Sequence, residues 1–412
     1  MSFSREELRS IRKQFPALDK QVNGAPAVYL DGPAGSQVPR LVIDAMVDYL
    51  SNCNANRGGL FETSRRSDEI LGQAHRAMAA FLGADDPDCI VFGSNMTTLV
   101  MALARALSRT WSSGDEVIVT SLDHDANFTP WKLAAGDAGI DVREVALNRD
   151  DCSLNLDDLC SKLSPRTRLV AFCAASNLSG SLAPVAEVCR LAREVGALSF
   201  VDAVHYAPHL SISAKEWGCD FLACSAYKFF GPHVGVLWGK RKILEEVTPY
   251  KLRPAPDGLP GRWMTGTQNH EGIAGAKAAV DYLASLGEGG NSLRESLLLS
   301  FDSIRTHESE LSKLFLDGFL QLNRFQLFGI DDCSRIAERA PTFSFRHEFI
   351  PPRELVAKLA ERGIFAWHGN FYAQPVTETL GLEPDGLVRV GFLHYTTSEE
   401  VERLLEELRR LS

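Results

Sequence analysis

Short apolar runs recur along the chain from about residue 89, and amphipathic stretches separate them. The runs are rich in Val, Ile and Phe and do not alternate strictly with polar residues, which is typical of strands covered on both faces. Seven runs are expected to form strands: 89–94, 116–122, 142–147, 168–176, 198–204, 220–226 and 235–239. Helices are expected at 96–109, 128–138 and 184–195, the last with proline at its start and glycine at its end. This repetition predicts a doubly wound, mainly parallel sheet.

The rhythm changes in the C-terminal third of the chain. A Gly/Pro-rich stretch at 254–261 interrupts the pattern, and 292–322 is expected to form one long helix or two abutting ones. The remainder predicts strands and helices in alternation: strands 343–347 and 387–392, and helices 353–363 and 398–410. We therefore expect a second, smaller α/β domain.

Composition and charge narrow the class of protein. The chain has 412 residues, of which 45% are apolar and 23% charged, as in ordinary globular proteins. The 43 basic and 53 acidic residues give a net charge of −10, which weighs against nucleic-acid binding. No apolar run approaches the roughly 18 residues of a membrane span, and the N-terminus lacks the apolar core of a signal peptide. The sequence predicts a cytoplasmic protein that binds neither membrane nor nucleic acid.

Nine cysteines are scattered along the chain, and none forms a CxxC pair. A disulfide framework or a zinc site needs tighter spacing, so we expect buried free thiols and no metal site.

Two motifs at predicted strand ends carry the strongest chemical signal. VDAVH (201–205) places Asp202 at the end of one strand, and CSAYKFFGPHVG (224–235) places Lys228 after the next. Carboxyl ends of parallel strands share one edge of the sheet, so both side chains are expected to face one crevice. By itself the pair could be a structural ion pair. Pyridoxal phosphate, however, needs a lysine for its Schiff base and a carboxylate that keeps its pyridine nitrogen protonated.

Three further loops supply what that cofactor requires. GSNMT (93–97) lies between a strand and a helix, where free N–H groups bind phosphate. LDHDAN (122–127) places His124 where its ring can lie flat on a pyridine, and SNLSG (176–180) places Asn177 after another strand. Together with Asp202 and Lys228, these loops predict a pyridoxal phosphate site.

These motifs resemble the class V aminotransferase-type enzymes of the cysteine desulfurase family, closest to its SufS-like branch. The resemblance runs from YLDGPAGSQVP (29–39) to HYTTSEEVERLLEEL (394–408). Family members carry SNxxG, VDxAQ, SxHKxxGP and an RGTTE-like loop, which correspond here to SNLSG, VDAVH, SAYKFFGP and FGSNMT. The resemblance implies a fold type I pyridoxal phosphate-dependent transferase with a mainly parallel seven-stranded sheet. With the pattern above, it predicts a large domain over 25–285 and a small domain formed by 1–24 and 286–412.

The resemblance also implies roles for individual cofactor-binding residues. Lys228 corresponds to the Schiff-base lysine, Asp202 to the partner of the ring nitrogen, and His124 to a ring that stacks on the cofactor and relays protons. His205 stands where the family has glutamine beside the phenolic oxygen. The remaining expected cofactor contacts are the backbone of Asn95 and Met96, and the side chains of Asn177, Ser225 and Tyr227.

Three more residues are expected to complete the site. Arg389, in LVRVGF, corresponds to the arginine that holds the substrate α-carboxylate, a task suited to a bidentate guanidinium. Arg57, in NANRGG, corresponds to an arginine near the site mouth, and Asn177 is expected to contact substrate as well as cofactor. Thr267, in RWMTGTQN, corresponds to a threonine that reaches the phosphate of the neighbouring subunit, which implies a homodimer with shared active sites.

The pattern departs from the family at one decisive loop. Desulfurases carry a mobile cysteine in a stretch such as RTGHHCAQP, but WHGNFYAQP (367–375) has Tyr372 at the cysteine position and Trp367 at the arginine. Tyrosine cannot hold sulfane sulfur, although it can transfer a proton. Tyr372 is interpreted as a filler, an acid–base group or a wall of the substrate pocket.

The chain keeps Lys228, Asp202 and Arg389 but lacks the sulfur-accepting cysteine. This combination predicts that the substrate Cα is deprotonated and that the carbanion then reacts in a way other than sulfur transfer to the protein. The favoured reaction is C–S bond cleavage by β-elimination on an α-amino acid. Alternatives are an epimerase, racemase or aminotransferase acting through the same carbanion, and a cysteine desulfurase that uses another thiol. A non-catalytic pyridoxal phosphate-binding protein is the alternative from a different class.

Overall fold

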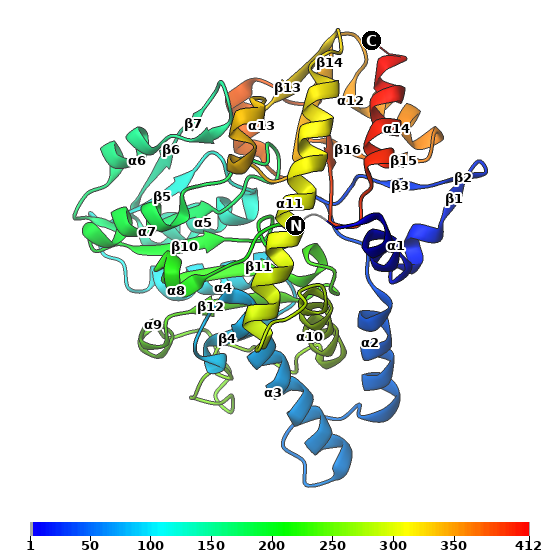
Figure 1. The fold of residues 1–412 in the computed structure, drawn as a ribbon. Helices are drawn as coiled ribbons and strands as arrows, with labels where there is room; N and C mark the ends of the chain where they lie inside the picture. The colour runs from blue at the N-terminus through cyan, green and yellow to red at the C-terminus, as the bar shows by residue number, and fades with distance from the viewer. Residues whose placement is uncertain (1–2, 412) are drawn as a thin grey trace.

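The computed structural model describes residues 3–411 and has a large central sheet of seven strands (Figure 1). The strands lie in this order: β4 (Ile90–Gly93), β12 (Gly235–Gly239), β11 (Phe221–Ser225), β10 (Leu198–Asp202), β9 (Thr167–Cys173), β5 (Glu116–Thr120) and β6 (Asp141–Val145). β12 runs antiparallel to both of its neighbours, and the other pairings are parallel. The predicted fold class is confirmed, and all seven predicted strands are present.

The helices of this part of the chain include the three expected from the sequence. They are α2 (Arg40–Asn52), α3 (Glu62–Leu82), α4 (Met96–Ser108), α5 (Thr129–Ala138), α6 (Leu156–Lys162), α7 (Val185–Glu194), α8 (Ala214–Trp217), α9 (Arg241–Glu246) and α10 (His270–Ser285). α7 follows Pro184 and buries Val185, Val188 and Ala192 on one face, as its apolar spacing predicts. α10 packs against α2 and α3, and α2 and α3 extend away from the sheet (Figure 1).

A smaller four-stranded antiparallel sheet lies in the C-terminal part. Its order is β13 (Phe325–Phe328), β14 (Thr342–His347), β17 (Leu387–Gly391) and β16 (Trp367–Gly369). Its helices are α12 (Pro352–Glu361), α13 (Gln374–Leu380) and α14 (Ser398–Arg409). Short elements near the N-terminus lie beside this sheet: the hairpin of β1 (Gln21–Val22) and β2 (Ala25–Pro26), and β3 (Val28–Tyr29), which pairs with β15 (Ile364–Phe365). The first helix, α1 (Arg5–Lys13), instead buries Ile11 in the core of the large sheet.

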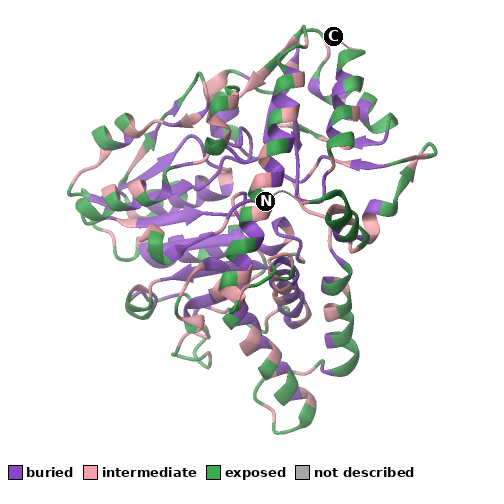
Figure 2. Cartoon of the chain, in the orientation of Figure 1, coloured by how far each residue is buried: buried purple, intermediate pink, exposed green. Residues whose placement is uncertain are grey.

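One long helix, α11 (Leu293–Phe319), joins the two parts, and it is a single helix rather than two (Figure 1). Its N-terminal half buries Leu297 and Ile304 in the core around the large sheet, while its C-terminal half buries Leu311 and Phe315 in the core of the small sheet. Figure 2 shows buried residues along the strands and exposed residues on the outer helix faces. The two halves of the molecule therefore meet along α11.

The domain boundaries expected from the sequence stay a prediction, and the packing near the N-terminus bears on them. Ile11, Phe15 and Leu18 pack into the core of the large sheet, whereas Val28 and Leu30 pack into the core of the small sheet. The chain thus crosses between the two cores near residue 25.

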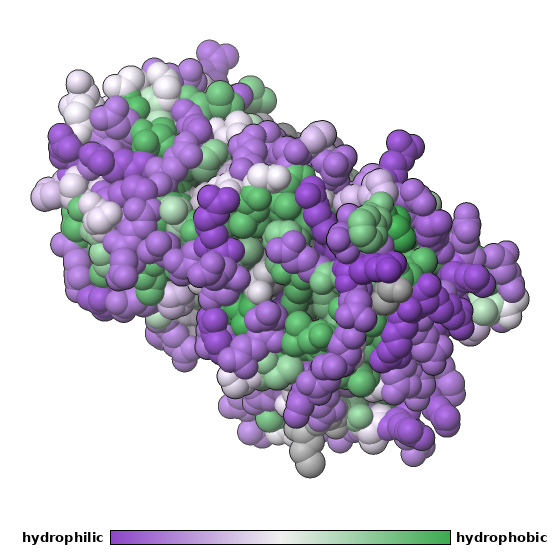
Figure 3. Space-filling model, turned by 90° about the horizontal axis from the view of Figure 1, so that it is seen from above, coloured by the Kyte–Doolittle hydropathy of each residue, from purple (hydrophilic) through white to green (hydrophobic). Residues whose placement is uncertain are grey.

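Among the described residues, no helix is long and apolar enough to cross a membrane. On the face seen in Figure 3, hydrophilic side chains cover most of the surface and apolar ones form smaller patches between them.

Candidate active site

A cavity opens at the carboxyl ends of the central strands, the edge at which ligands bind in sheets of this kind. The lining comes from loops that follow five strands: Asn95, Met96, Thr97, His124, Ala126, Cys173, Ala175, Asn177, Asp202, Val204, His205, Ser225, Tyr227 and Lys228. Eight of the residues predicted for cofactor binding from separate motifs therefore line one cavity, together with the predicted catalytic Lys228.

Lys228 and Asp202 lie at the buried centre of this cavity, on neighbouring strand ends. Lys228 ends the short 3-10 helix η4 (Ala226–Lys228), and its Nζ donates to the carbonyl of Pro33. Burial and the positive charge of Arg389 lower the pKa of Lys228 to about 7. Burial also raises the pKa of Asp202 to about 6, although the backbone N–H of Val204 donates to its Oδ1 over 2.8 Å. The cavity therefore holds an amine and a carboxylate that both titrate near neutral pH.

The N-terminus of α4 forms a polar end of the cavity. Asn95 caps this 13-residue helix by accepting from the N–H of Thr98, and the N–H of Met96 lies 3.0 Å from Ser225 Oγ. A Cβ on Gly235 would lie 2.3 Å from the backbone carbon of Asn95, so only glycine lets β12 approach this turn. Helix N-termini with a neighbouring hydroxyl favour phosphate.

His124 and Asn177 lie at other positions on the cavity wall. His124 Nδ1 accepts from the N–H of Ala126 over 3.0 Å, so that nitrogen carries no proton. Burial, with Lys228 and Arg389 nearby, lowers the pKa of His124 to about 4, which keeps its ring neutral. Asn177 Nδ2 donates to the carbonyl of Phe371 over 2.9 Å.

Two buried polar atoms on the cavity wall, Asn177 Oδ1 and His205 Nδ1, have no protein partner among the described residues. Buried polar atoms are normally satisfied, so these two indicate a polar ligand. A phosphate end, a central amine beside a carboxylate, and two free polar groups fit pyridoxal phosphate.

Arg389, the predicted substrate anchor, lies outside the lining of the cavity. It is buried on β17, its Nη1 donates to the carbonyl of Asn177 over 2.7 Å, and the Phe371 ring lies 4.1 Å from its guanidinium carbon. Burial lowers its pKa to about 9. The structure therefore places Arg389 beside Asn177 and under an aromatic ring.

Tyr372 also lies outside the cavity lining and is 72% exposed. Its ring stacks on His124 with centroids 5.5 Å apart, and its carbonyl accepts from the N–H of Asp125 over 2.6 Å. Phe371 and Tyr372 both have φ of 58°, a left-handed conformation unfavourable for bulky residues. These contacts hold the segment 370–373, here termed the cover segment, against the site.

Two other predicted residues are not brought to this cavity. Arg57 lies on the surface and pairs with Asp68 over 3.0 Å. Thr267 is exposed and does not line the cavity of its own chain. Its predicted role requires a second subunit and stays a prediction.

The structure adds three residues that the sequence reasoning did not single out. Phe371 covers Arg389, and Cys173 lines the cavity as a buried thiol. Asp31 is half-buried near Arg389 and Lys228, and desolvation of its carboxyl raises its pKa to about 6. Its place within the YLDGPAGSQVP motif was the one available signal.

Comparison with known proteins identifies the family. The model of the family described as Aminotransferase class-V matches residues 28–404. A cysteine desulfurase of Pectobacterium carotovorum is 31% identical, with 98% of each chain covered. A probable cysteine desulfurase of Halalkalibacterium halodurans is 30% identical, with 97% of each chain covered.

Solved structures agree with this assignment. The apo structure of a cysteine desulfurase from Thermococcus onnurineus is similar with a TM-score of 0.87 at 26% identity, covering 100% of this chain and 99% of the other. The Escherichia coli cysteine desulfurase CsdA is similar with a TM-score of 0.84 at 26% identity, covering 100% and 98%. The chain therefore belongs to the class V aminotransferase family, whose enzymes of the cysteine desulfurase type depend on pyridoxal phosphate, as the sequence motifs predicted.

Proposed function

We propose that the protein is a pyridoxal phosphate-dependent lyase that cleaves a C–S bond of an α-amino acid by β-elimination. The observation that carries this proposal is the composition of the cavity. It combines Lys228, Asp202 and His124 with a single lining thiol, Cys173, within the described part of the chain. Such a site can remove a Cα proton, but it offers no accessible acceptor for sulfur.

The chain's own residues would divide the work as follows. Pyridoxal phosphate, when bound, supplies an electron sink for the substrate Cα. Lys228 would hold the cofactor and take the Cα proton, a task favoured by a pKa of about 7. Asp202 would keep a proton at the ring nitrogen, and His205 would contact the phenolic oxygen. Met96, Thr97 and Ser225 would hold the phosphate at the N-terminus of α4.

Cys173 is a poor candidate for the persulfide-forming thiol. It is buried beside the strand end of β9, and its Sγ lies 3.7 Å from the carbonyl of Leu122. Burial, followed by the nearby carboxyl groups of Asp123 and Asp202, raises its pKa well above the ordinary value. Since the thiolate is the nucleophile, this environment disfavours attack on sulfur.

The substrate end would be formed where Arg389 and Asn177 meet the cover segment. Arg389 would bind the α-carboxylate once the Phe371 ring moves from its guanidinium, and Asn177 would contact the same end of the substrate. Tyr372 contacts the site through its stacked ring and its backbone carbonyl, which supports a role as a wall or a filler. Arg57 would act only near the mouth.

A panel of amino acids tests the reaction type with the purified holoenzyme. Cysteine, its thioethers and amino acids without sulfur are scored for pyruvate, thiol, sulfide and inverted product, and the cysteines are mapped for persulfide by mass spectrometry. We expect a 2-oxo acid and a thiol or sulfide in equal amounts from a sulfur-containing substrate. A persulfide formed at any cysteine during turnover, inverted amino acid, or amino-group transfer without elimination would contradict the proposal. An inert holoenzyme would point to a non-catalytic role.

We further propose that two copies of the chain form a homodimer. Large apolar side chains are exposed on and after α2, namely Leu41, Val47, Leu50, Leu60 and Phe61. A second copy would cover these side chains. It would also place Thr267 of one subunit near the phosphate in the cavity of the other subunit. Sedimentation velocity tests the dimer. Mixing inactive Thr267→Glu and Lys228→Ala variants tests the sharing, because a mixed dimer regains one intact site only if Thr267 acts across the interface.

A further inference from the structure

Three buried polar residues lead from the cavity wall toward the junction of the two cores. His205 follows β10 and lines the cavity, His209 lies one turn further along the same loop, and Glu308 lies on α11. All three are at most 3% exposed. Neither His209 nor Glu308 lines the cavity, so the site described above does not account for them.

His205 is held on one side by a hydroxyl from the small sheet. Its Nε2 lies 2.9 Å from Oγ1 of Thr342, the first residue of β14. Its Nδ1 is the buried nitrogen without a protein partner among the described residues. If Thr342 donates to Nε2, the neutral ring carries its proton on Nδ1, which then becomes a donor for a ligand in the cavity.

The other side of His205 packs on a second histidine, His209. The rings of His205 and His209 meet edge to face, with centroids 5.3 Å apart and an interplanar angle of 71°. His209 Nδ1 lies 2.9 Å from Glu308 Oε2, which fixes the ring of His209. Burial, followed by His209, Lys228 and Arg389, lowers the pKa of His205 well below its ordinary value, so that its ring stays neutral.

Hydrogen bonds of a buried arginine, Arg339, fix the backbone around His205, His209 and Glu308. A small second cavity beside His209 and Glu308 is also lined by Arg305, Ser312 and Arg339. Buried Arg339 donates through Nη2 to the carbonyls of Thr342 over 2.5 Å and Ser179 over 3.2 Å, and through Nη1 to the carbonyl of Ile330.

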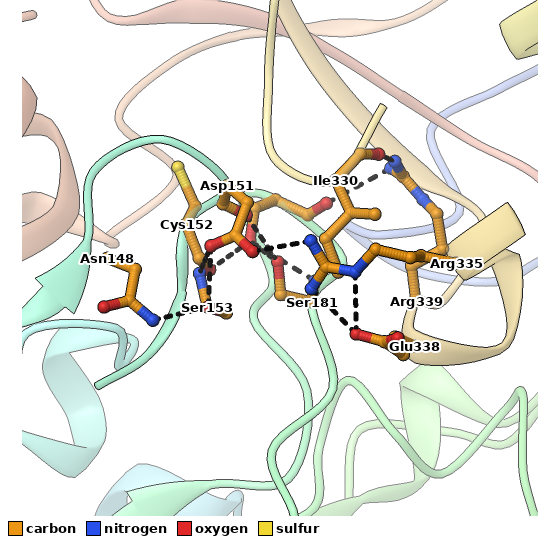
Figure 4. A network of polar contacts seen from close by, with 10 residues as sticks. Asn148, Asp151, Cys152, Ser153, Ser181, Ile330, Arg335, Glu338 and Arg339 are labelled. Carbon is orange, nitrogen blue, oxygen red and sulfur yellow. Dashed lines mark hydrogen bonds and ion pairs between the residues drawn. The ribbon is translucent and has the colours of Figure 1, made fainter. Parts of the chain in front are cut away.

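Figure 4 shows the next layer of contacts, where Arg335 lies between Asp151 and Glu338. Its Nη1 lies 2.9 Å from Asp151 Oδ2 and its Nη2 2.7 Å from Glu338 Oε2, while Ser181 Oγ donates to the Asp151 carbonyl over 3.3 Å. This network ties the loop between β7 (Leu147–Asn148) and β8 (Ser153–Leu154) to the 3-10 helix η5 (Cys333–Glu338), which precedes Arg339 and Thr342.

We propose that Thr342, His209 and Glu308 are positioning residues that orient His205, with a proton on Nδ1, as a hydrogen-bond donor to the phenolic oxygen of pyridoxal phosphate. Thr342 sets the tautomer, and the His209–Glu308 pair fixes the ring plane. The inference rests on the proposed function, because it takes His205 to face that oxygen. Its consequence is that the cofactor's electronic state depends on contacts between the two halves of the molecule.

The pH dependence of the visible absorbance of the holoenzyme, without any amino acid, tests this inference. A hydrogen bond donated to the phenolic oxygen favours its ionised form, so losing the bond raises the pH of the absorbance midpoint. Thr342→Val removes the hydroxyl while keeping the shape, and we expect the midpoint to rise by about one unit, as for part of a charge-assisted hydrogen bond. Thr342→Ser keeps a hydroxyl and should restore the wild-type midpoint.

A double variant, His209→Phe with Glu308→Gln, tests the role of the His209–Glu308 pair without leaving an unpaired buried carboxylate. We expect a smaller rise in the same direction. The matched control is His307→Phe, which alters a buried histidine on α11 whose Nε2 lies 2.8 Å from the carbonyl of Thr396 instead. It should leave the midpoint unchanged.

Each variant is first checked for folding by circular dichroism and for bound cofactor by absorbance after alkaline release. An unchanged or lower midpoint in folded, cofactor-loaded Thr342→Val overturns the inference, as does an equal shift in His307→Phe. If the double variant does not fold, the Thr342 pair decides alone. Because no substrate is present, this result is independent of the amino-acid panel, so each proposal can fail separately.

Discussion

The two sides of the candidate site are built in contrasting ways. On the sheet side, Lys228, Asp202 and Ser225 lie at the ends of adjacent strands, are buried, and line the cavity directly. On the cover side, Phe371 and Tyr372 lie in a segment with two left-handed residues, and Arg389 is held beneath it. A rigid sheet edge suits a cofactor that stays in place, whereas a segment held by a few side-chain contacts suits a substrate that must enter and leave.

The contrast between the two sides indicates which substitutions should change the reaction. Among the residues that the family resemblance assigns to the cofactor, the sheet side keeps Asn177, Asp202, Ser225 and Lys228 as in the family motifs, whereas His205, Tyr227 and the FGSNMT loop differ from them. On the cover side, the family resemblance predicts that Tyr372 takes the position of the sulfur-accepting cysteine. We therefore expect substitutions on the sheet side to abolish cofactor chemistry, and those on the cover side to alter substrate affinity and the fate of the product.

The largest effect is expected for Lys228→Ala, on the sheet side. Loss of the amine should remove the visible absorbance of bound pyridoxal phosphate and lower turnover by at least about 10²–10⁴, the usual contribution of a positioned proton-transfer group. Absorbance and product formation are measured together. Lys240→Ala, which alters a lysine paired with Asp220 over 2.7 Å, is the control and should leave both unchanged. Full turnover by Lys228→Ala would disprove the role of Lys228 in cofactor binding and proton transfer.

Arg389→Ala tests whether the cover side anchors substrate. One charge-assisted hydrogen-bonded pair contributes about 1.5–3 kcal/mol, so KM for an α-amino acid should rise by about 10–100-fold. The comparison substrate is an amine that lacks the carboxylate, whose KM should not change. Equal losses for both would show that Arg389 only supports the fold through its bond to Asn177.

The pH dependence of cofactor uptake tests the sheet side again. With the pKa of Lys228 lowered to about 7, the reactive neutral amine predominates above that pH and falls about tenfold for each unit below it. Reconstitution of apoenzyme with pyridoxal phosphate, followed by absorbance, should therefore accelerate up to about pH 7 and then level off. A rate that keeps rising tenfold per unit to pH 9 would show that Lys228 retains an ordinary pKa.

Phe371→Leu probes the contact between the cover and Arg389. If Arg389 anchors substrate, the ring competes with substrate for its guanidinium, and a cation–π contact contributes about 0.5–1 kcal/mol at an exposed site and about 2 kcal/mol when desolvated, as around buried Arg389. KM for an α-amino acid should therefore fall by up to about thirtyfold, with kcat changed less. Leu133→Ala, which alters an exposed apolar residue on α5, is the control. A higher KM would mean that Phe371 binds substrate rather than blocking its anchor.

The smallest effect is expected for Tyr372→Phe, because the contacts of Tyr372 with the site run through its ring and its backbone. Turnover should stay within about twofold of wild type. A loss of about 10² or more would identify the hydroxyl as an acid–base group. Tyr372→Ala should instead change the preference among substrate side chains if the ring forms a wall of the pocket.

Much of this fold could be predicted because its signals are local. Each of the seven strands is a short apolar run, and Pro184 and Gly196 mark the ends of the stretch that contains α7. The prediction of strand 168–176 is longer than β9, which ends at Cys173. Beyond it Ala175 pairs in an isolated bridge with Leu182, as the chain turns to form the cavity wall. Apolar composition alone does not reveal such a turn.

The sequence by itself determined which strand carries which reactive side chain at its carboxyl end. An acid ends one strand, a lysine follows the next, and small polar loops follow others. This is possible because parallel strands bring their carboxyl ends to one edge, so motifs far apart in sequence share a site without further information. Only the tertiary structure decided that Phe371 covers Arg389, and that His205 lies between Thr342 and the His209–Glu308 pair. The His205–Thr342 and His209–Glu308 contacts join segments more than 90 residues apart, whereas Phe371 and Arg389 come from two elements of the small-sheet part. The first two contacts depend on how α11 and the small sheet pack against the large one, and no local pattern of residues encodes that packing.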